Sequence, residues 1–138
     1  MDLPTLFHYK KLSFVRIKEA LKLSEVKQDG SFLYIELPTG KKALLQFEII
    51  KDLGVMRLLH TYTPPQFRGR GLGEKLVKAA IEYAKMNMLK IEPVCSYSIY
   101  YFIVHPDERG VLVDWFKQKS DEELRALYEY FHSIENSG

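Results

Sequence analysis

The hydrophobic pattern of this chain changes its period abruptly where Pro64 and Pro65 stand side by side. Before this pair, apolar and polar residues alternate in runs rich in β-forming side chains, which is typical of half-buried strands. After it, apolar residues recur every three or four positions from residue 72 to about residue 88, which predicts an amphipathic helix. A chain of 138 residues with this switch favours an α+β fold, in which helices pack on a sheet.

Three alternating runs precede the proline pair, over residues 31–37, 42–50 and 55–63. The first two are joined by "PTGK", in which Pro38 presets φ and Gly40 permits a positive φ, so we expect a hairpin. The third run follows the turn signal "KDLG" and stops at the prolines, which cannot donate to a strand ladder. The sequence therefore predicts a meander of antiparallel strands.

The sequence predicts further elements besides these three strands and the long helix. The last helix begins with a capping box, because Ser120 and Glu123 have the spacing at which each side chain accepts the other's backbone N–H. The remaining predicted elements are a possible helix over residues 13–23, a short strand over 90–97 that Pro93 interrupts, a short helix within 97–109 that closes at His105 and Pro106, and the last helix over 121–134.

Composition bounds the class of protein. Hydrophobic residues make up 46% and charged residues 28% of the chain, which is typical of one globular domain. The net charge of +2 is too small to favour a nucleic-acid partner. One cysteine, Cys95, excludes an internal disulfide framework and a cysteine-rich zinc site. The start, "MDLPTLFHYKKL", lacks a long apolar run and no stretch is long enough to span a membrane, so we expect a cytoplasmic protein.

The stretch "QFRGRGLGEKL" lies between the last predicted strand and the long helix. The N–H groups at a helix start carry partial positive charge, and Gly69, Gly71 and Gly73 lack Cβ atoms that would keep a ligand away from them. Arg68 and Arg70 add full positive charges. The stretch therefore has the chemistry of a pyrophosphate-binding turn, although a plain strand-to-helix connection is the alternative. The Walker pattern is absent, and the spacing is not that of a dinucleotide-binding fold.

The residues Arg68-Gly69-Arg70-Gly71-Leu72-Gly73 resemble the Q/R-x-x-G-x-G/A motif of the GNAT acetyltransferase superfamily. The order of antiparallel strands, glycine turn, long helix and further strand also resembles that superfamily over roughly residues 25–106. The stretches "HTYTPPQFRGRGLGEKLV" and "YAKMNMLKIEPVCSYSIYYFIVHPD" are similar to a subgroup of small stand-alone GNAT-like proteins. We therefore expect one GNAT-like domain over residues 1–138, with a mixed-edge antiparallel sheet, packed helices and a helical extension over 107–138.

The resemblance implies a set of functional residues. In GNAT proteins this turn binds the pyrophosphate of acetyl-coenzyme A, which places that role on residues 68–73, mostly through backbone N–H groups. The pantetheine arm is expected between two splayed strands, and Pro64, Pro65 and Pro93 fit such splaying because each removes a ladder donor. A main-chain N–H near Tyr62 or Thr63 is expected to serve the oxyanion. No metal is implied.

Three side chains are candidates for the chemistry. His60 ends the strand before the turn and is either a general base or a half-buried strand residue. Cys95 is expected on the strand that faces "HTYT", where a thiol lines the site, accepts an acetyl group or simply belongs to the core. Tyr97 is the candidate that protonates the thiolate, as a tyrosine just after this strand often does in GNAT enzymes. Glu48 and Glu92 are more simply solvated strand residues.

Two functional hypotheses follow from these residues. The first is an N-acetyltransferase that moves acetyl from acetyl-coenzyme A to an amine by direct attack, with a small molecule or a protein as the acceptor. The second is a coenzyme-A-binding module or sensor without turnover. Neither requires nucleic acid, a membrane or a metal, and both are compatible with a monomer or a homodimer.

Overall fold

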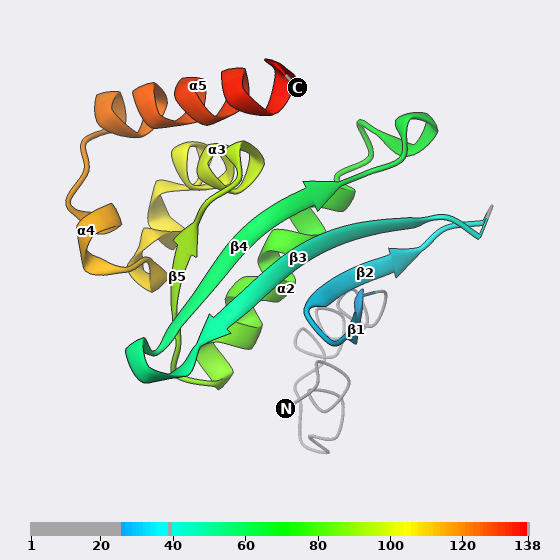
Figure 1. The fold of residues 1–138 in the computed structure, drawn as a ribbon, viewed down its shortest axis with the longest axis horizontal. Helices are drawn as coiled ribbons and strands as arrows, with labels where there is room; N and C mark the ends of the chain where they lie inside the picture. Colours follow the sequence, from blue (N-terminus) through cyan, green and yellow to red (C-terminus); the bar gives the residue numbers. More distant parts are fainter. Residues whose placement is uncertain (1–25, 39, 138) are drawn as a thin grey trace.

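A computed structural model describes residues 26–38 and 40–137, so the possible helix over residues 13–23 lies outside the described part. Figure 1 shows a twisted sheet with the long helix α2 across one face and the helices α3 and α5 grouped beside the β5 edge. The α+β architecture predicted from the sequence is confirmed. The elements are β1 Val26–Asp29, β2 Phe32–Glu36, β3 Lys42–Ile50, β4 Val55–Tyr62, α2 Leu72–Met86, β5 Lys90–Pro93, α3 Ser96–Val104, α4 Asp114–Lys117 and α5 Asp121–Ser137, together with short 3₁₀ turns.

The five strands lie in the order in which they occur in the chain, β1-β2-β3-β4-β5. The first three pairs are antiparallel, as the meander predicts, and β4 pairs with β5 in parallel, which makes the edge mixed. Strand β1 was not predicted as a separate strand. Its signal was the dipeptide Asp29-Gly30, which favours a tight hairpin turn, and Gly30 has a φ of +56° there.

Strand β4 carries a bulge in its pairing with β3, near the point where its pairing with β5 ends. Phe47 pairs with Leu58 while Gln46 pairs with His60, so Leu59 is the extra residue. On the other side, the pairing of β4 with β5 runs only as far as Leu58 and Pro93. The N–H groups of Val94 and Cys95 both donate to the Leu58 carbonyl, at 2.9 and 3.2 Å, and the two strands then separate. The pairing stops here because β5 itself ends at Pro93 and the chain continues into α3, so the expected splaying of two continuing strands stays a prediction.

Helix α2 packs its apolar stripe on the sheet, with Leu76, Val77, Ala80, Ile81 and Ala84 all at 2% exposure or less. The helix was predicted from residue 72 to about residue 88, and it ends about two residues earlier, at Met86.

The hydrophobic core extends past residue 106, where the GNAT-like core was expected to end. Leu112, Val113, Phe116 and Leu124 belong to the same buried cluster as the sheet and α2. Leu112 forms a parallel bridge with Ile91, and the Val113 N–H donates to the Ile91 carbonyl at 2.9 Å. The segment after α3 thus adds one bridge to the β5 edge instead of a full strand, and it forms part of the domain core.

Helix α5 begins at the predicted capping box. The Ser120 N–H donates to Glu123 Oε1 at 2.9 Å, and the Glu123 N–H donates to Ser120 Oγ at 3.1 Å. The helix runs back along α3 (Figure 1). The rings of Tyr100 on α3 and Tyr128 on α5 lie 5.7 Å apart. No helix within residues 26–38 and 40–137 is long and apolar enough to cross a membrane.

Candidate functional site

The glycine turn has the open backbone that the sequence predicted. Gly69 and Gly71 have φ angles of +81° and +76°, and a Cβ atom built on either would meet nothing within 4 Å. Gly71 is the N-cap of α2, and its carbonyl accepts the first helical hydrogen bond, from Lys75 N–H at 3.1 Å. The N–H groups of the preceding residues in the first turn have no intrahelical acceptor, because helix geometry provides none. The turn therefore presents donors with open space beside the backbone.

The two arginines of the turn have different surroundings. Arg68 Nε donates to the Thr63 carbonyl at 2.9 Å, which ties the turn to the end of β4. The Arg70 guanidinium lies 5.3 Å from the centre of the Phe67 ring, and Phe67 is buried beneath it. Both arginines are exposed. They surround the start of α2 with positive charge while their side chains also stabilise the turn.

Position 73 requires a glycine for a packing reason that the sequence did not reveal. A Cβ atom at Gly73 would lie 2.8 Å from Cζ of Tyr97, and 3.0 Å from both Cε1 and the hydroxyl oxygen. The Tyr97 ring therefore packs directly on the first turn of α2. Unlike Gly69 and Gly71, this glycine makes room for an aromatic side chain from α3.

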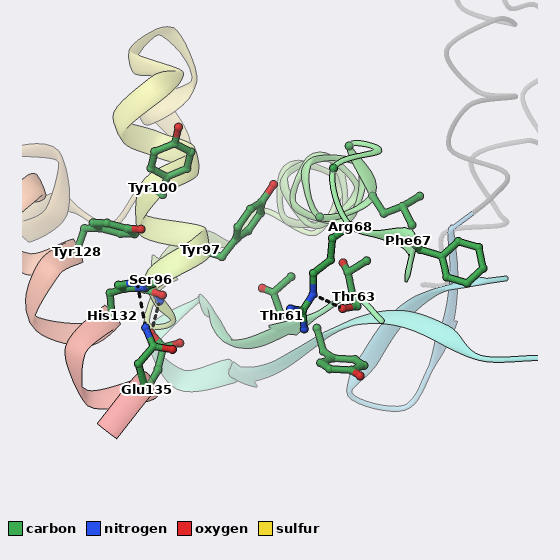
Figure 2. Close-up of a pocket in the computed structure, with 16 residues that line it drawn as sticks. Thr61, Thr63, Phe67, Arg68, Ser96, Tyr97, Tyr100, Tyr128, His132 and Glu135 are labelled. Carbon is green, nitrogen blue, oxygen red and sulfur yellow. Dashed lines mark hydrogen bonds between the residues drawn. The ribbon is translucent and has the colours of Figure 1, made fainter. Parts of the chain in front are cut away.

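A cavity of about 660 Å³ connects this turn with α3 and α5. Figure 2 shows Thr63 and Arg68 towards one end, Tyr97 in the middle, and Tyr100, Tyr128 and Glu135 towards the other. The walls are formed by residues 61–63, by most of the turn over 67–73, by Ser96, Tyr97 and Tyr100 of α3, and by Tyr128, His132, Glu135 and Asn136 of α5.

Tyr97 is held as a neutral phenol in this cavity. Its burial raises its pKa above the ordinary value of 10, and the negative charge of Glu74 on α2 raises it further. The hydroxyl therefore keeps its proton at neutral pH and can donate it to a stronger base nearby. Of the three catalytic candidates, Tyr97 is the one that lines the cavity.

Cys95 does not lie on strand β5, where the sequence placed it. The strand ends at Pro93, and Cys95 is the N-cap of α3. Its side chain is buried, and its thiol donates to Ser98 Oγ at 3.2 Å while Ser98 Oγ donates to the Cys95 carbonyl at 2.8 Å. Thr61 Oγ1 lies 3.3 Å from the sulfur. Because the thiol proton is used on Ser98, the Thr61 hydroxyl is the donor to the sulfur.

His60 lies on the other face of the sheet. Directly paired residues of antiparallel strands point to the same side. Thr61 pairs with Leu45, which is fully buried against the helices, whereas His60 pairs with Gln46, which points away from them. His60 is exposed and is not among the residues that line the cavity. The structure therefore brings Tyr97, Thr61 and Cys95 together and leaves His60 apart from them.

The carboxylates on the strands form a separate group. Arg57 Nε donates to Glu92 at 2.7 Å and Arg57 Nη1 donates to Glu48 at 2.8 Å, so both glutamates belong to a surface ion-pair network. Both carboxylates raise the pKa of Arg57 further above its ordinary value. Within residues 26–38 and 40–137, no three His, Cys, Asp or Glu side chains gather as a metal site requires.

Four cavity residues on α5 were not identified from the sequence. Tyr128, His132 and Glu135 recur at positions i, i+4 and i+7, which places them on one face of the helix. Glu135 Oε2 accepts a hydrogen bond from the Ser96 N–H at 3.2 Å, and the Asn136 amide lies 3.0 Å from His132 Nε2. The spacing was visible in the sequence, but nothing in it indicated that this face would meet α3.

Comparison with known proteins gives the same family as the sequence resemblance. The sequence matches the family model of GCN5-related N-acetyltransferases over residues 32–111, which include β2 to β5, α2 and α3. The fold is similar to the NMR solution structure of a protein from Staphylococcus aureus named a "GCN5-like putative N-acetyltransferase". That match has 28% sequence identity, covers 64% of this chain and 87% of the other, and has a TM-score of 0.53. The chain belongs to the GCN5-related N-acetyltransferase (GNAT) family, as the motif over residues 68–73 predicted.

Proposed function

We propose that the protein transfers acetyl from acetyl-coenzyme A to an amine by direct attack of that amine on the thioester. The observation that carries the proposal is the continuity of one cavity. An open, donor-rich turn that suits a pyrophosphate leads into the space beside Tyr97, next to the point where β4 and β5 separate.

The residues of the turn fit the phosphate groups of coenzyme A. Gly69 and Gly71 leave the backbone open, and the first N–H groups of α2, at Leu72 and Gly73, carry the partial positive charge of the helix start. Arg68 and Arg70 add full charges that attract a polyanion. The gap beyond Leu58, where β4 no longer pairs with β5, is the place for the pantetheine arm.

Bound acetyl-coenzyme A would supply a thioester whose carbonyl carbon accepts the amine nitrogen as the carbon–sulfur bond breaks. A main-chain N–H near Tyr62 or Thr63 donates to the oxyanion that develops on the carbonyl oxygen. Tyr97 gives its proton to the departing thiolate, a role that suits a phenol kept neutral by burial. The amine nitrogen loses a proton to water as the C–N bond forms, and that loss balances the proton that the thiolate gains.

Cys95 and His60 have supporting roles in this proposal. The Cys95 thiol donates to Ser98 and holds the Thr61 hydroxyl in the cavity wall, so we assign it to positioning and not to a covalent acetyl intermediate. The role of His60 as general base stays a prediction. Because its ring lies on the far face of β4, it would have to act through water at the strand end. His60→Gln should then lower the rate by about 10²-fold or more, and an unchanged rate would refute this role.

Binding and turnover together test the proposal. Calorimetry on the full chain should show coenzyme A binding that Gly71→Val weakens strongly, since the side chain enters the open space and φ is +76°. Gly40→Val is the matched control, because Gly40 has a φ of +82° and equally open surroundings in the β2–β3 turn. If the Gly71→Val protein binds coenzyme A as tightly as the wild-type protein, the glycine turn is not the pyrophosphate-binding site.

Turnover separates the enzyme from the alternative. Thiol release from acetyl-coenzyme A in the presence of an amine supports the transferase. Tight coenzyme A binding without thiol release across a broad set of amines would instead favour the non-catalytic binding module. The cytoplasmic location inferred from the sequence is part of the same proposal and is tested by cell fractionation.

A further inference from the structure

The end of the cavity away from the glycine turn is built by α5, which lies outside the family match over residues 32–111. Tyr128, His132 and Glu135 face α3 from consecutive turns of this helix, and Tyr100 faces them from α3 (Figure 2). This wall therefore includes residues that the shared family region does not contain.

Glu135 places a negative charge in this wall. Its Oε2 accepts the Ser96 N–H at 3.2 Å, and in the part of the chain that the structure describes no lysine or arginine forms an ion pair with it. Glu135 is exposed at this end of the cavity, so its carboxylate is accessible to a cation from the ligand. The opposite end of the cavity, at Arg68, is positively charged, so the two ends attract groups of opposite sign.

The aromatic side chains beside this carboxylate suit the same ligand. Tyr100 and Tyr128 lie 5.7 Å apart with their rings inclined at 45°, and His132 stacks on Tyr128 at 5.3 Å. Tyr100 is 45% exposed, which leaves much of its ring accessible. Ring faces of this kind bind methylene chains and attract ammonium groups.

We propose that the acceptor is an aliphatic diamine whose alkyl chain packs on Tyr100 and Tyr128 and whose non-reacting ammonium group pairs with Glu135. This inference rests on the proposed acetyltransferase function and names its acceptor class. Ser96, the hydrogen-bond partner of Glu135, is adjacent to Tyr97, so the diamine would extend from the carboxylate towards the proposed proton donor.

The chemistry of the reaction indicates which nitrogen Glu135 holds. The attacking amine has to be neutral, and a carboxylate beside it would favour the charged ammonium form. Glu135 is therefore better suited to the second, distal nitrogen, which stays charged throughout the reaction. One amine then forms the new C–N bond while the other supplies binding energy.

The test is a titration of two probes into the full-chain protein saturated with coenzyme A. Calorimetry should show that 1,4-diaminobutane binds about two- to fivefold more tightly than n-pentylamine, which has similar length and one charge fewer, because an ion pair with an exposed carboxylate is weak. Glu135→Gln should bring this ratio close to one, because the amide oxygen still accepts the Ser96 N–H while the charge is lost. Glu129→Gln, the same change at an exposed position of α5 outside the cavity wall, should leave the ratio unchanged.

Several outcomes would overturn the inference. These are equal affinities of the wild-type protein for the two amines, no binding of either, or a ratio that Glu135→Gln does not change. If that variant does not fold, as judged by circular dichroism, rising salt provides the same readout in the wild-type protein. The advantage of the diamine should shrink as salt screens the charge pair, and an advantage independent of salt counts against Glu135.

Thiol release distinguishes this inference from the function on which it rests. Charge-dependent diamine binding without any acetyl transfer would leave the subsite in place and refute the enzyme. Equal kcat/KM for the diamine and n-pentylamine, with no change of the ratio in Glu135→Gln, would refute the subsite and leave the enzyme in place.

Discussion

The contact between Gly73 and Tyr97 predicts how a single methyl group should affect the enzyme. In Gly73→Ala the new Cβ would lie 2.8 Å from Cζ of Tyr97, whereas ordinary contacts begin at 3.4 Å. The ring therefore has to move by about 0.6 Å to restore an ordinary contact, the difference between these two distances. Tyr97 is half-buried on the cavity side, so it has room to move there, and α2 itself need not unfold.

Two opposing terms set the effect of Gly73→Ala on stability. Overpacking of this kind costs about 1–3 kcal/mol. Alanine in place of glycine in a helix returns about 1 kcal/mol. The free energy of unfolding should thus fall by roughly 0–2 kcal/mol, a Tm decrease of no more than about 8 °C. Gly110→Ala is the control, because a Cβ there meets nothing within 4 Å and no positive φ is involved.

The effect of Gly73→Ala on rate should be larger than its effect on stability. A catalytic group displaced by a fraction of an ångström to 1 Å lowers the rate by about 10–100-fold. We expect kcat, measured by thiol release, to fall by that factor while coenzyme A affinity changes little. In a Tyr97→Phe background the same change should have almost no further effect on kcat, because the hydroxyl is already lost. A folded Gly73→Ala protein with wild-type kcat would refute the proposed position and role of Tyr97.

Two further predictions concern the pH profile and the cysteine. Burial, and then the charge of Glu74, raise the pKa of Tyr97 above 10. Because the phenol therefore keeps its proton at lower pH, kcat should show no decline from loss of this proton between pH 7 and pH 9. A decline near pH 8 that Tyr97→Phe removes would contradict this prediction. Cys95→Ala should lower the free energy of unfolding by about 1–2 kcal/mol, since a buried group and its hydrogen bonds to Ser98 and Thr61 are lost, yet retain at least about a tenth of the turnover. Rapid-quench mass spectrometry that found a stoichiometric acetyl adduct on Cys95, consumed at the rate of turnover, would overturn the direct mechanism.

Local patterns in the sequence predicted the elements that depend on local geometry. Alternation at period two identified β2, β3 and β4, and the 3.6-residue period identified α2 and α5 to within a few residues at their ends. The capping box at Ser120 and the open glycine turn at Gly69 and Gly71 follow from backbone rules that act over a few residues. These features needed no knowledge of what packs against them.

Tertiary structure decided which candidate side chains meet. The extra residue Leu59 in β4 reverses the alternation, so that Thr61 faces the helices and His60 faces away, and a bulge of one residue leaves no clear mark in the hydrophobic pattern. The end of β5 at Pro93 places Cys95 at the start of α3 behind Thr61 instead of in the gap.

The contacts that complete the cavity join residues that are far apart in the chain. Gly73 of α2 packs against the Tyr97 ring of α3. The Ser96 N–H of α3 donates to Glu135 of α5, which lies 39 positions further along the chain. Such contacts depend on how α3 and α5 pack on the sheet, because the periodicity of a helix determines which residues share a face but not which neighbour that face contacts. The sequence by itself therefore determined the open glycine turn and the family, and only the packing of α5 on α3 decided which residues form the other end of the cavity.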